Sequence, residues 1–251
     1  SLPGENRAYL MTRMSEAYLG MMDIVEAEKC LKVALKSAPN DPDLKKLNDE
    51  IGNFLEGHLS CESIQCKPAR LSMKTAEKEA LEFYRNISED EEFDFSPPLG
   101  YYAKGLEIML DNEIWQTIRK EVLEIFYSEK SNGIPDKLYS NLPGPLKASL
   151  SRYENNRRTL SLGAWGNINF KSEDGHPVTD TVYSKINEKY GNNFILIKNA
   201  CKFLTPYRND VFHKKVKGKK ETLEVRKKVI SYLNPVISLL YSSDSSEEFN
   251  S

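Results

Sequence analysis

The stretch LEVRKKVISYLNPVISLL, residues 223–240, decides the fold class of this chain. Its apolar residues recur every three or four positions, which places them on one face of an α-helix: Leu223, Val229, Ile230, Leu233, Val236, Ile237 and Leu240. We expect Pro235 to kink the helix, because proline lacks an amide proton and crowds the carbonyl one turn earlier. The stretch predicts a long amphipathic helix near the C-terminus.

The same period continues through the rest of the chain. Apolar residues with helical spacing occupy the ranges 76–84, 106–126, 160–165, 182–190 and 194–204. No segment alternates apolar and polar residues in the way that predicts a β-strand. The sequence therefore predicts an all-α protein, built as a helical bundle with a helical hairpin at its N-terminus.

A chain of 251 residues is long enough for two small domains. We expect an N-terminal helical segment at 1–57, a polar linker at 58–70 and a larger helical domain at 71–242. The Ser- and Glu-rich residues 243–251 are typical of a disordered tail. The opening residues 1–4 resemble the start of an excised fragment, so we expect further sequence upstream.

The N-terminal segment carries a spaced set of small and aromatic residues at Tyr18, Ala27, Leu31, Ala34 and Pro39. This spacing resembles the tetratricopeptide repeat, in which alanines lie where two helices cross and a proline closes the turn. Met14 and Ser15 stand where the repeat usually has Leu-Gly. Because one repeat cannot bury its own face, we expect either a longer upstream array or packing onto the next domain. A plain helical hairpin is the alternative interpretation.

A short motif, Tyr207-Arg-Asn-Asp-Val-Phe-His213, places an arginine, an asparagine and one of only three histidines close together. Thr205 and Pro206 are typical of a helix start, which would put Arg208 in the first turn. On such a helix Asn209 and His213 share a face, and Arg208 lies about 140° and roughly 7.5 Å away from His213.

The pattern Arg208-Asn209-x-x-x-His213 resembles the signature of the HEPN superfamily over about residues 71–242. Members of this superfamily are all-helical, and many are metal-independent ribonucleases that act as dimers. The resemblance implies that Arg208, Asn209 and His213 are catalytic. It also implies a homodimer formed through the HEPN-like domain.

The chemistry of these three side chains fits RNA cleavage without a metal. The reaction needs a base for the 2′-hydroxyl proton, stabilisation of the phosphorane and an acid for the leaving oxygen. His213 can exchange a proton near neutral pH, Arg208 can grip phosphate oxygens, and Asn209 can orient His213. A single catalytic histidine in each chain cannot easily serve as both acid and base, so a two-fold dimer is expected. The alternative assigns His213 a structural role and Arg208 an ion pair.

A basic patch follows the motif in a chain whose net charge is only −2. We expect its lysines to track RNA phosphates: Lys214, Lys215, Lys217, Lys219 and Lys220. Tyr207 is a candidate for stacking on a base. The alternatives are a solvated loop for the lysines and a packing role for Tyr207.

No cofactor or metal is expected. His58, Cys61 and Cys66 lie close together in sequence, but a fourth zinc ligand is missing nearby, and free thiols are the simpler interpretation. Four cysteines are too few for a disulfide scaffold, and the chain has neither a signal peptide nor an apolar run long enough for a membrane. We therefore expect a cytoplasmic protein with no membrane contact.

These observations predict a metal-independent endoribonuclease of HEPN type that cleaves RNA by attack of the 2′-hydroxyl. The resemblance implies a regulated role in defence, toxin or stress systems. The tetratricopeptide-like segment would dock a protein partner. The alternative is a non-catalytic helical module for protein interaction.

Overall fold

The computed structural model describes residues 4–21, 24–88, 91–131, 160–167, 177–208 and 214–241. Helices dominate these residues, which confirms the predicted helical class, and they hold one sheet of two short strands. The elements are α1 (Gly4–Gly20), α2 (Ile24–Ser37), α3 (Pro42–Leu55), η1 (Cys61–Ser63), α4 (Lys67–Asn86), β1 (Glu92–Asp94), α5 (Ser96–Leu110), η2 (Asp111–Trp115), α6 (Gln116–Ser131), α9 (Leu162–Asn167), α10 (Pro177–Tyr190), η3 (Gly191–Asn193), α11 (Phe194–Arg208), β2 (Lys215–Lys217) and α12 (Gly218–Tyr241).

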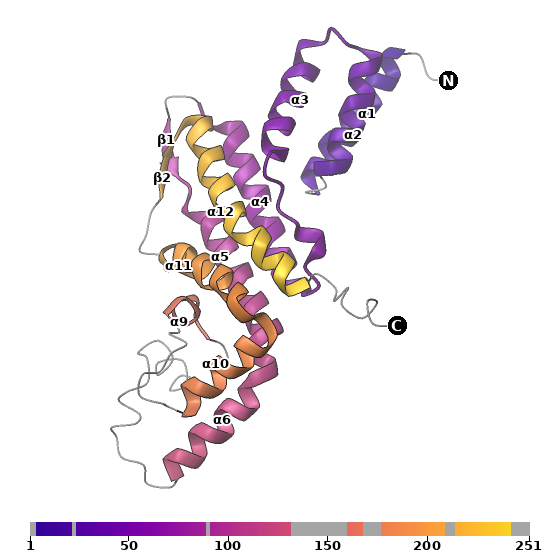
Figure 1. Cartoon of the computed structure of the whole chain (residues 1–251). Coiled ribbons are helices and arrows are strands. Elements are labelled where there is room, and N and C mark those ends of the chain that lie inside the picture. The colour runs from indigo at the N-terminus through magenta and orange to yellow at the C-terminus, as the bar shows by residue number, and fades with distance from the viewer. Residues whose placement is uncertain are drawn as a thin grey trace, which may run out of the picture.

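Helices α1 and α2 form a hairpin, and α3 follows beside α2 (Figure 1). Small residues of α2 lie inside this packed segment: Ala27 and Ala34 are both fully buried. Ser15, at the position where the repeat usually has glycine, is also fully buried, and its hydroxyl donates to the carbonyl of Ala27 at 2.8 Å. Asp41 caps α3 by accepting the amides of Asp43 and Leu44. Local capping and small side chains thus explain the shape of this segment.

The segment predicted as a polar linker, 58–70, is instead part of the packed structure. It buries Leu59, Cys61 and Ile64, and α4 already begins at Lys67. The predicted domain boundary at residue 71 therefore falls inside a helix. The prediction of a linker relied on the polar residues of this segment and overlooked the three residues that are buried, Leu59, Cys61 and Ile64.

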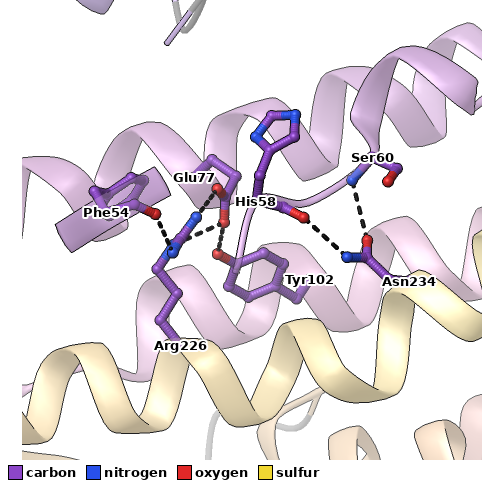
Figure 2. Close-up of polar contacts among 7 residues, drawn as sticks. All are labelled: Phe54, His58, Ser60, Glu77, Tyr102, Arg226 and Asn234. Carbon is purple, nitrogen blue, oxygen red and sulfur yellow. Dashed lines mark hydrogen bonds and ion pairs between the residues drawn. The ribbon is translucent and has the colours of Figure 1, made fainter. Parts of the chain in front are cut away.

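The side chain of Asn234 on α12 holds the start of that segment in place. Its amide nitrogen donates to the carbonyl of His58 at 2.8 Å, and its oxygen accepts the amide of Ser60 at 3.0 Å (Figure 2). Two backbone groups outside regular structure are thereby satisfied.

The centre of the molecule is a bundle in which α4 and α12 run side by side and α5 packs against α4 and α11 (Figure 1). Met73 and Leu106 are both fully buried there. Helix α5 continues through a π-helical turn, η2, into α6, which packs against α10. The short helix α9 packs on α11. No helix in the described ranges combines the length and apolar character needed to cross a bilayer.

The two strands form a small antiparallel ribbon that the sequence did not predict. Glu92 pairs with Lys217, Phe93 with Val216 and Asp94 with Lys215. Of the candidate RNA-binding lysines, Lys215 and Lys217 lie in β2, whereas Lys219 and Lys220 lie in the first turn of α12. The partner strand, β1, carries Glu92 and Asp94, so opposite charges face one another across the ribbon.

Candidate functional site

Arg208 is the last residue of α11, so the prediction that a helix begins at Thr205 is wrong. The hydroxyl of Thr205 does not cap a helix start but donates to the carbonyl of Cys201, one turn earlier, at 2.6 Å. Pro206 lies inside the same helix, which ends two residues later. Arg208 is therefore near the negative end of the helix dipole, where a cation is stabilised, and the amides of a helix start do not contribute to the site.

The Arg208 side chain forms an ion pair with Glu107, which projects from α5. Arg208 Nε donates to Glu107 Oε2 at 2.8 Å. The arginine side chain is 46% exposed and the glutamate side chain is 16% exposed. The arginine is thus held by a largely buried carboxylate, while its side chain as a whole remains partly exposed.

Tyr207 occupies a packing position beside this pair. Its ring meets Phe203 edge to face at a centroid distance of 6.1 Å, and Phe203 in turn stacks on Tyr232 at 4.7 Å. A Cβ added to Gly100 on α5 would lie 3.7 Å from the carbonyl of Tyr207, so the end of α11 lies against the first turns of α5. The half-buried ring supports the packing interpretation of Tyr207; its predicted stacking on a base stays a prediction.

Asn209 and His213, the other two candidate catalytic residues, lie outside the described residues. The chain is described again from Lys214, which is anchored on the N-terminal end of α5. The amide of Lys214 donates to the Ser96 hydroxyl at 2.7 Å, and its carbonyl accepts the amide of Phe95 at 2.8 Å. Both ends of the segment 209–213 are therefore attached to the same helix.

Three of the five candidate RNA-binding lysines are already paired with carboxylates. Lys214 pairs with Glu221 at 3.3 Å, Lys215 with Glu92 at 3.0 Å and Lys219 with Glu50 at 3.3 Å. Within the part of the chain that the structure describes, Lys217 and Lys220 have no ion pair. The positive potential available for phosphate is therefore smaller than the sequence predicted.

Glu221 links the lysine strand to the start of α12. It accepts the backbone amide of Lys217 at 2.9 Å and pairs with the Lys214 ammonium. The Lys217 amide and, second, the Lys214 side chain lower the pKa of this carboxyl. The ionised form of Glu221 thus stabilises the junction between β2 and α12.

Two ionisable groups near Glu107 have raised pKa values. Burial raises the pKa of Cys201 far above its usual value, and the Glu107 carboxylate adds to the effect. Burial also raises the pKa of Asp111, one turn beyond Glu107, although Gln116 donates to it at 2.9 Å.

A buried polar cluster, which sequence reasoning missed, lies in the middle of the bundle (Figure 2). Arg226 donates from Nη2 to Glu77 Oε2 at 2.5 Å and from Nη1 to the carbonyl of Phe54 at 2.8 Å. The Tyr102 hydroxyl donates to the same Glu77 carboxylate. Burial opposes the charge on Arg226, but Glu77 and Tyr102 together raise its pKa. The cluster is structural, since all four residues are buried.

The position of Glu77 was the one available signal for this cluster. It lies between Met73 and Ala80 on the apolar face of a predicted helix, where a charged side chain needs a buried partner. Nothing local indicates that Arg226, far along the sequence, is that partner.

Cys61, in the segment that also holds His58 and Cys66, is a buried free thiol. Among the described residues no three His, Cys, Asp or Glu side chains are grouped as metal ligands. Burial raises the pKa of Cys61 to about 12, so the free thiol is a poor nucleophile at neutral pH.

A shallow groove of about 400 Å³ lies between α1, α3 and α4. Its lining includes the apolar residues Leu44 and Leu47 and charged groups such as Glu16, Lys46 and Arg85. On α1 itself, Tyr9, Leu10 and Met14 are exposed, as is Met21 just beyond it. These features are suited to contact with another protein and are remote in sequence from Arg208.

Comparison with protein-family models, curated proteins and solved structures finds no match to this chain. Its function therefore has to be inferred from its own side chains. Arg208, with its fixed Nε edge and exposed outer face, is the group from which that inference starts.

Proposed function

We propose that this protein is a metal-independent endoribonuclease of HEPN type, with Arg208, Asn209 and His213 at its catalytic site. The observation that supports this most is the state of Arg208, which is held by Glu107 at 2.8 Å and is 46% exposed. A guanidinium that is both fixed and open to solvent can bind a phosphate group in a defined orientation.

The attachment of the flanking chain to α5 supports the pairing of Arg208 with His213. The carbonyl of Tyr207 lies against Gly100, and the amide of Lys214 bonds Ser96. These two positions on α5 are four residues apart, which corresponds to about 6 Å along a helix. The residue before Arg208 and the residue after His213 are thus anchored about one helical turn apart.

In the proposed reaction, a histidine takes the proton of the RNA 2′-hydroxyl, whose oxygen then attacks the adjacent phosphorus. Arg208 stabilises the extra negative charge of the phosphorane. The bond between phosphorus and the 5′-oxygen breaks, and an acid protonates the leaving oxygen. The products are a 2′,3′-cyclic phosphate and a 5′-hydroxyl. We propose a homodimer because two copies of His213 would then supply the base and the acid.

RNA binding is proposed for the lysines that follow the motif. Lys217 and Lys220, which have no ion pair among the described residues, would contact phosphates directly. Lys214, Lys215 and Lys219 would have to exchange a carboxylate for a phosphate, so their contribution to affinity would be smaller. The HEPN resemblance implies a regulated setting such as defence or stress, with the tetratricopeptide-like helices as the partner-binding part.

The proposal is tested by cleavage of a single-stranded RNA in excess EDTA. Arg208→Ala and His213→Ala should each lower the rate at least about a hundredfold, the scale of one acid–base or oxyanion contact. The controls are Arg13→Ala, an exposed arginine paired with Glu16, and His58→Ala, whose side chain is exposed. DNA of the same sequence should stay intact because it lacks the 2′-hydroxyl.

The competing proposal is a non-catalytic helical module for protein interaction. The exposed apolar residues of α1 and the groove beside α3 favour it. Unchanged RNA cleavage in the His213→Ala protein, or no cleavage by the unmodified protein, would reject the nuclease and leave the interaction module.

A further inference from the structure

We propose that Glu107 is a positioning residue that sets the orientation of Arg208 for phosphate binding. The inference rests on the proposed ribonuclease function and adds a residue from α5, 101 positions away in sequence from Arg208. The reason is that the Glu107 carboxylate binds the Nε edge of the Arg208 guanidinium.

Glu107 binds Arg208 through Nε, at 2.8 Å. A guanidinium has two forks for bidentate binding: one formed by Nε with a terminal nitrogen, and one formed by the two terminal nitrogens. The ion pair occupies the Nε side. The contact of Arg208 with Glu107 uses Nε alone. In the proposal, the fork of the two terminal nitrogens is assigned to two phosphate oxygens.

The difference in exposure between the two side chains favours positioning over simple surface pairing. Glu107 is 16% exposed and Arg208 is 46% exposed, so the carboxylate holds the arginine from the protein side. Helix α5 is buried along Leu106 and Met109 on either side of Glu107, which gives the carboxylate a rigid base. A long arginine side chain at the end of a helix would otherwise sample several rotamers.

A carboxylate in this position has opposite effects on binding and on turnover. Its negative charge repels an approaching phosphate and so weakens ground-state RNA binding. Its hydrogen bond keeps the terminal fork aligned with the phosphorane, and a misplacement of about 1 Å can cost up to roughly a hundredfold in rate. Removing the charge should therefore leave RNA affinity equal or higher while turnover falls.

The first test is Glu107→Gln, measured by single-turnover RNA cleavage and by RNA binding in the same buffer. We expect the cleavage rate at saturation to fall roughly ten- to a hundredfold while the RNA Kd is unchanged or lower. Glu107→Asp keeps the charge but withdraws it by one methylene, so it should lose turnover without a gain in affinity. The matched control is Glu121→Gln, which removes the carboxylate of another interhelical ion pair, to Lys185 at 3.2 Å.

The second test asks whether Glu107 acts through Arg208. Arg208→Lys keeps the positive charge but has no Nε edge for the carboxylate to hold. The Glu107→Gln change should therefore have no further effect on turnover in the Arg208→Lys background. A residue that only supports the fold of α5 would lower the rate by the same factor in both backgrounds, and that result would overturn the positioning role.

The outcomes separate this inference from the proposed function. If the unmodified protein cleaves RNA and Arg208→Ala abolishes cleavage, but Glu107→Gln cleaves at the unmodified rate, only the positioning role is rejected. If the unmodified protein does not cleave RNA in EDTA, or Arg208→Ala remains fully active, the ribonuclease proposal is rejected and the role of Glu107 with it.

Discussion

At the scale of single residues, two arginines of this protein form carboxylate pairs with very different surroundings. Arg226 is fully buried and binds Glu77, Tyr102 and the carbonyl of Phe54. Arg208 is partly exposed and binds the carboxylate of Glu107. A buried pair loses all its hydration, so every donor must find a partner inside the protein. The exposed arginine is under no such constraint and can exchange partners.

Glu77→Gln should destabilise the protein by about 3–5 kcal/mol, because it leaves the Arg226 charge buried without a counter-charge. The free energy of unfolding, measured by urea denaturation at neutral pH, checks this. Glu16→Gln is the matched control: Glu16 pairs with Arg13 on the exposed face of α1, and we expect no measurable change. Equal stability of the two variants would contradict the structural role of the buried cluster.

At the scale of elements, the close contact of α4 and α5 depends on a glycine. A Cβ on Gly105 would lie 2.8 Å from Cε and 3.0 Å from Cγ of Met73, which is fully buried. Gly52 on α3 is the opposite case, since a Cβ added there would meet nothing within 4 Å. The same residue type therefore has a packing function in one helix and none in the other.

Gly105→Ala should lower the free energy of unfolding by about 1–3 kcal/mol, because the added methyl overpacks the contact with Met73. Gly52→Ala should raise it by roughly 0.5–1 kcal/mol, because alanine loses less backbone entropy in a helix. Chemical denaturation of both variants under one condition measures the difference. A stabilising effect of Gly105→Ala would show that α4 and α5 do not pack this closely.

At the scale of the whole molecule, the N-terminal helices and the bundle share one hydrophobic core. Polar contacts join them as well: Glu50 pairs with Lys219, Glu56 with Lys227, and the carbonyl of Phe54 accepts from Arg226. The N-terminal helices pack onto the rest of the described structure, which is one of the two arrangements expected for them. The N-terminal segment is therefore held by both apolar and polar contacts.

This arrangement predicts a single cooperative unfolding transition. Both tryptophans, Trp115 and Trp165, are buried outside the N-terminal helices α1–α3, so their fluorescence reports on the rest of the protein. Far-ultraviolet circular dichroism, in contrast, reports on all helices. The two signals should give coincident urea denaturation curves if the parts unfold together. Loss of circular dichroism at lower urea than the fluorescence change would show that the N-terminal helices unfold separately.

The sequence by itself determined the helical class, because the apolar period of a helix is a local property of residues three and four positions apart. It also singled out Arg208, through its short spacing to Asn209 and His213. Local reasoning was wrong at Thr205, since a threonine hydroxyl can cap a helix start or bond the carbonyl one turn earlier. Which of these two bonds Thr205 forms depends on where the helix that contains it ends, and that helix continues to Arg208.

Only the tertiary structure decided which charged groups meet. Glu107 and Arg208, Glu77 and Arg226, and the strands at 92–94 and 215–217 are each separated by more than a hundred residues. No periodicity links such positions, because a partner is selected by which helix faces pack together and not by spacing along the chain. For the same reason, the lysine run looked free in the sequence, whereas folding brings Glu92 and Glu50 from two distant parts of the chain to Lys215 and Lys219.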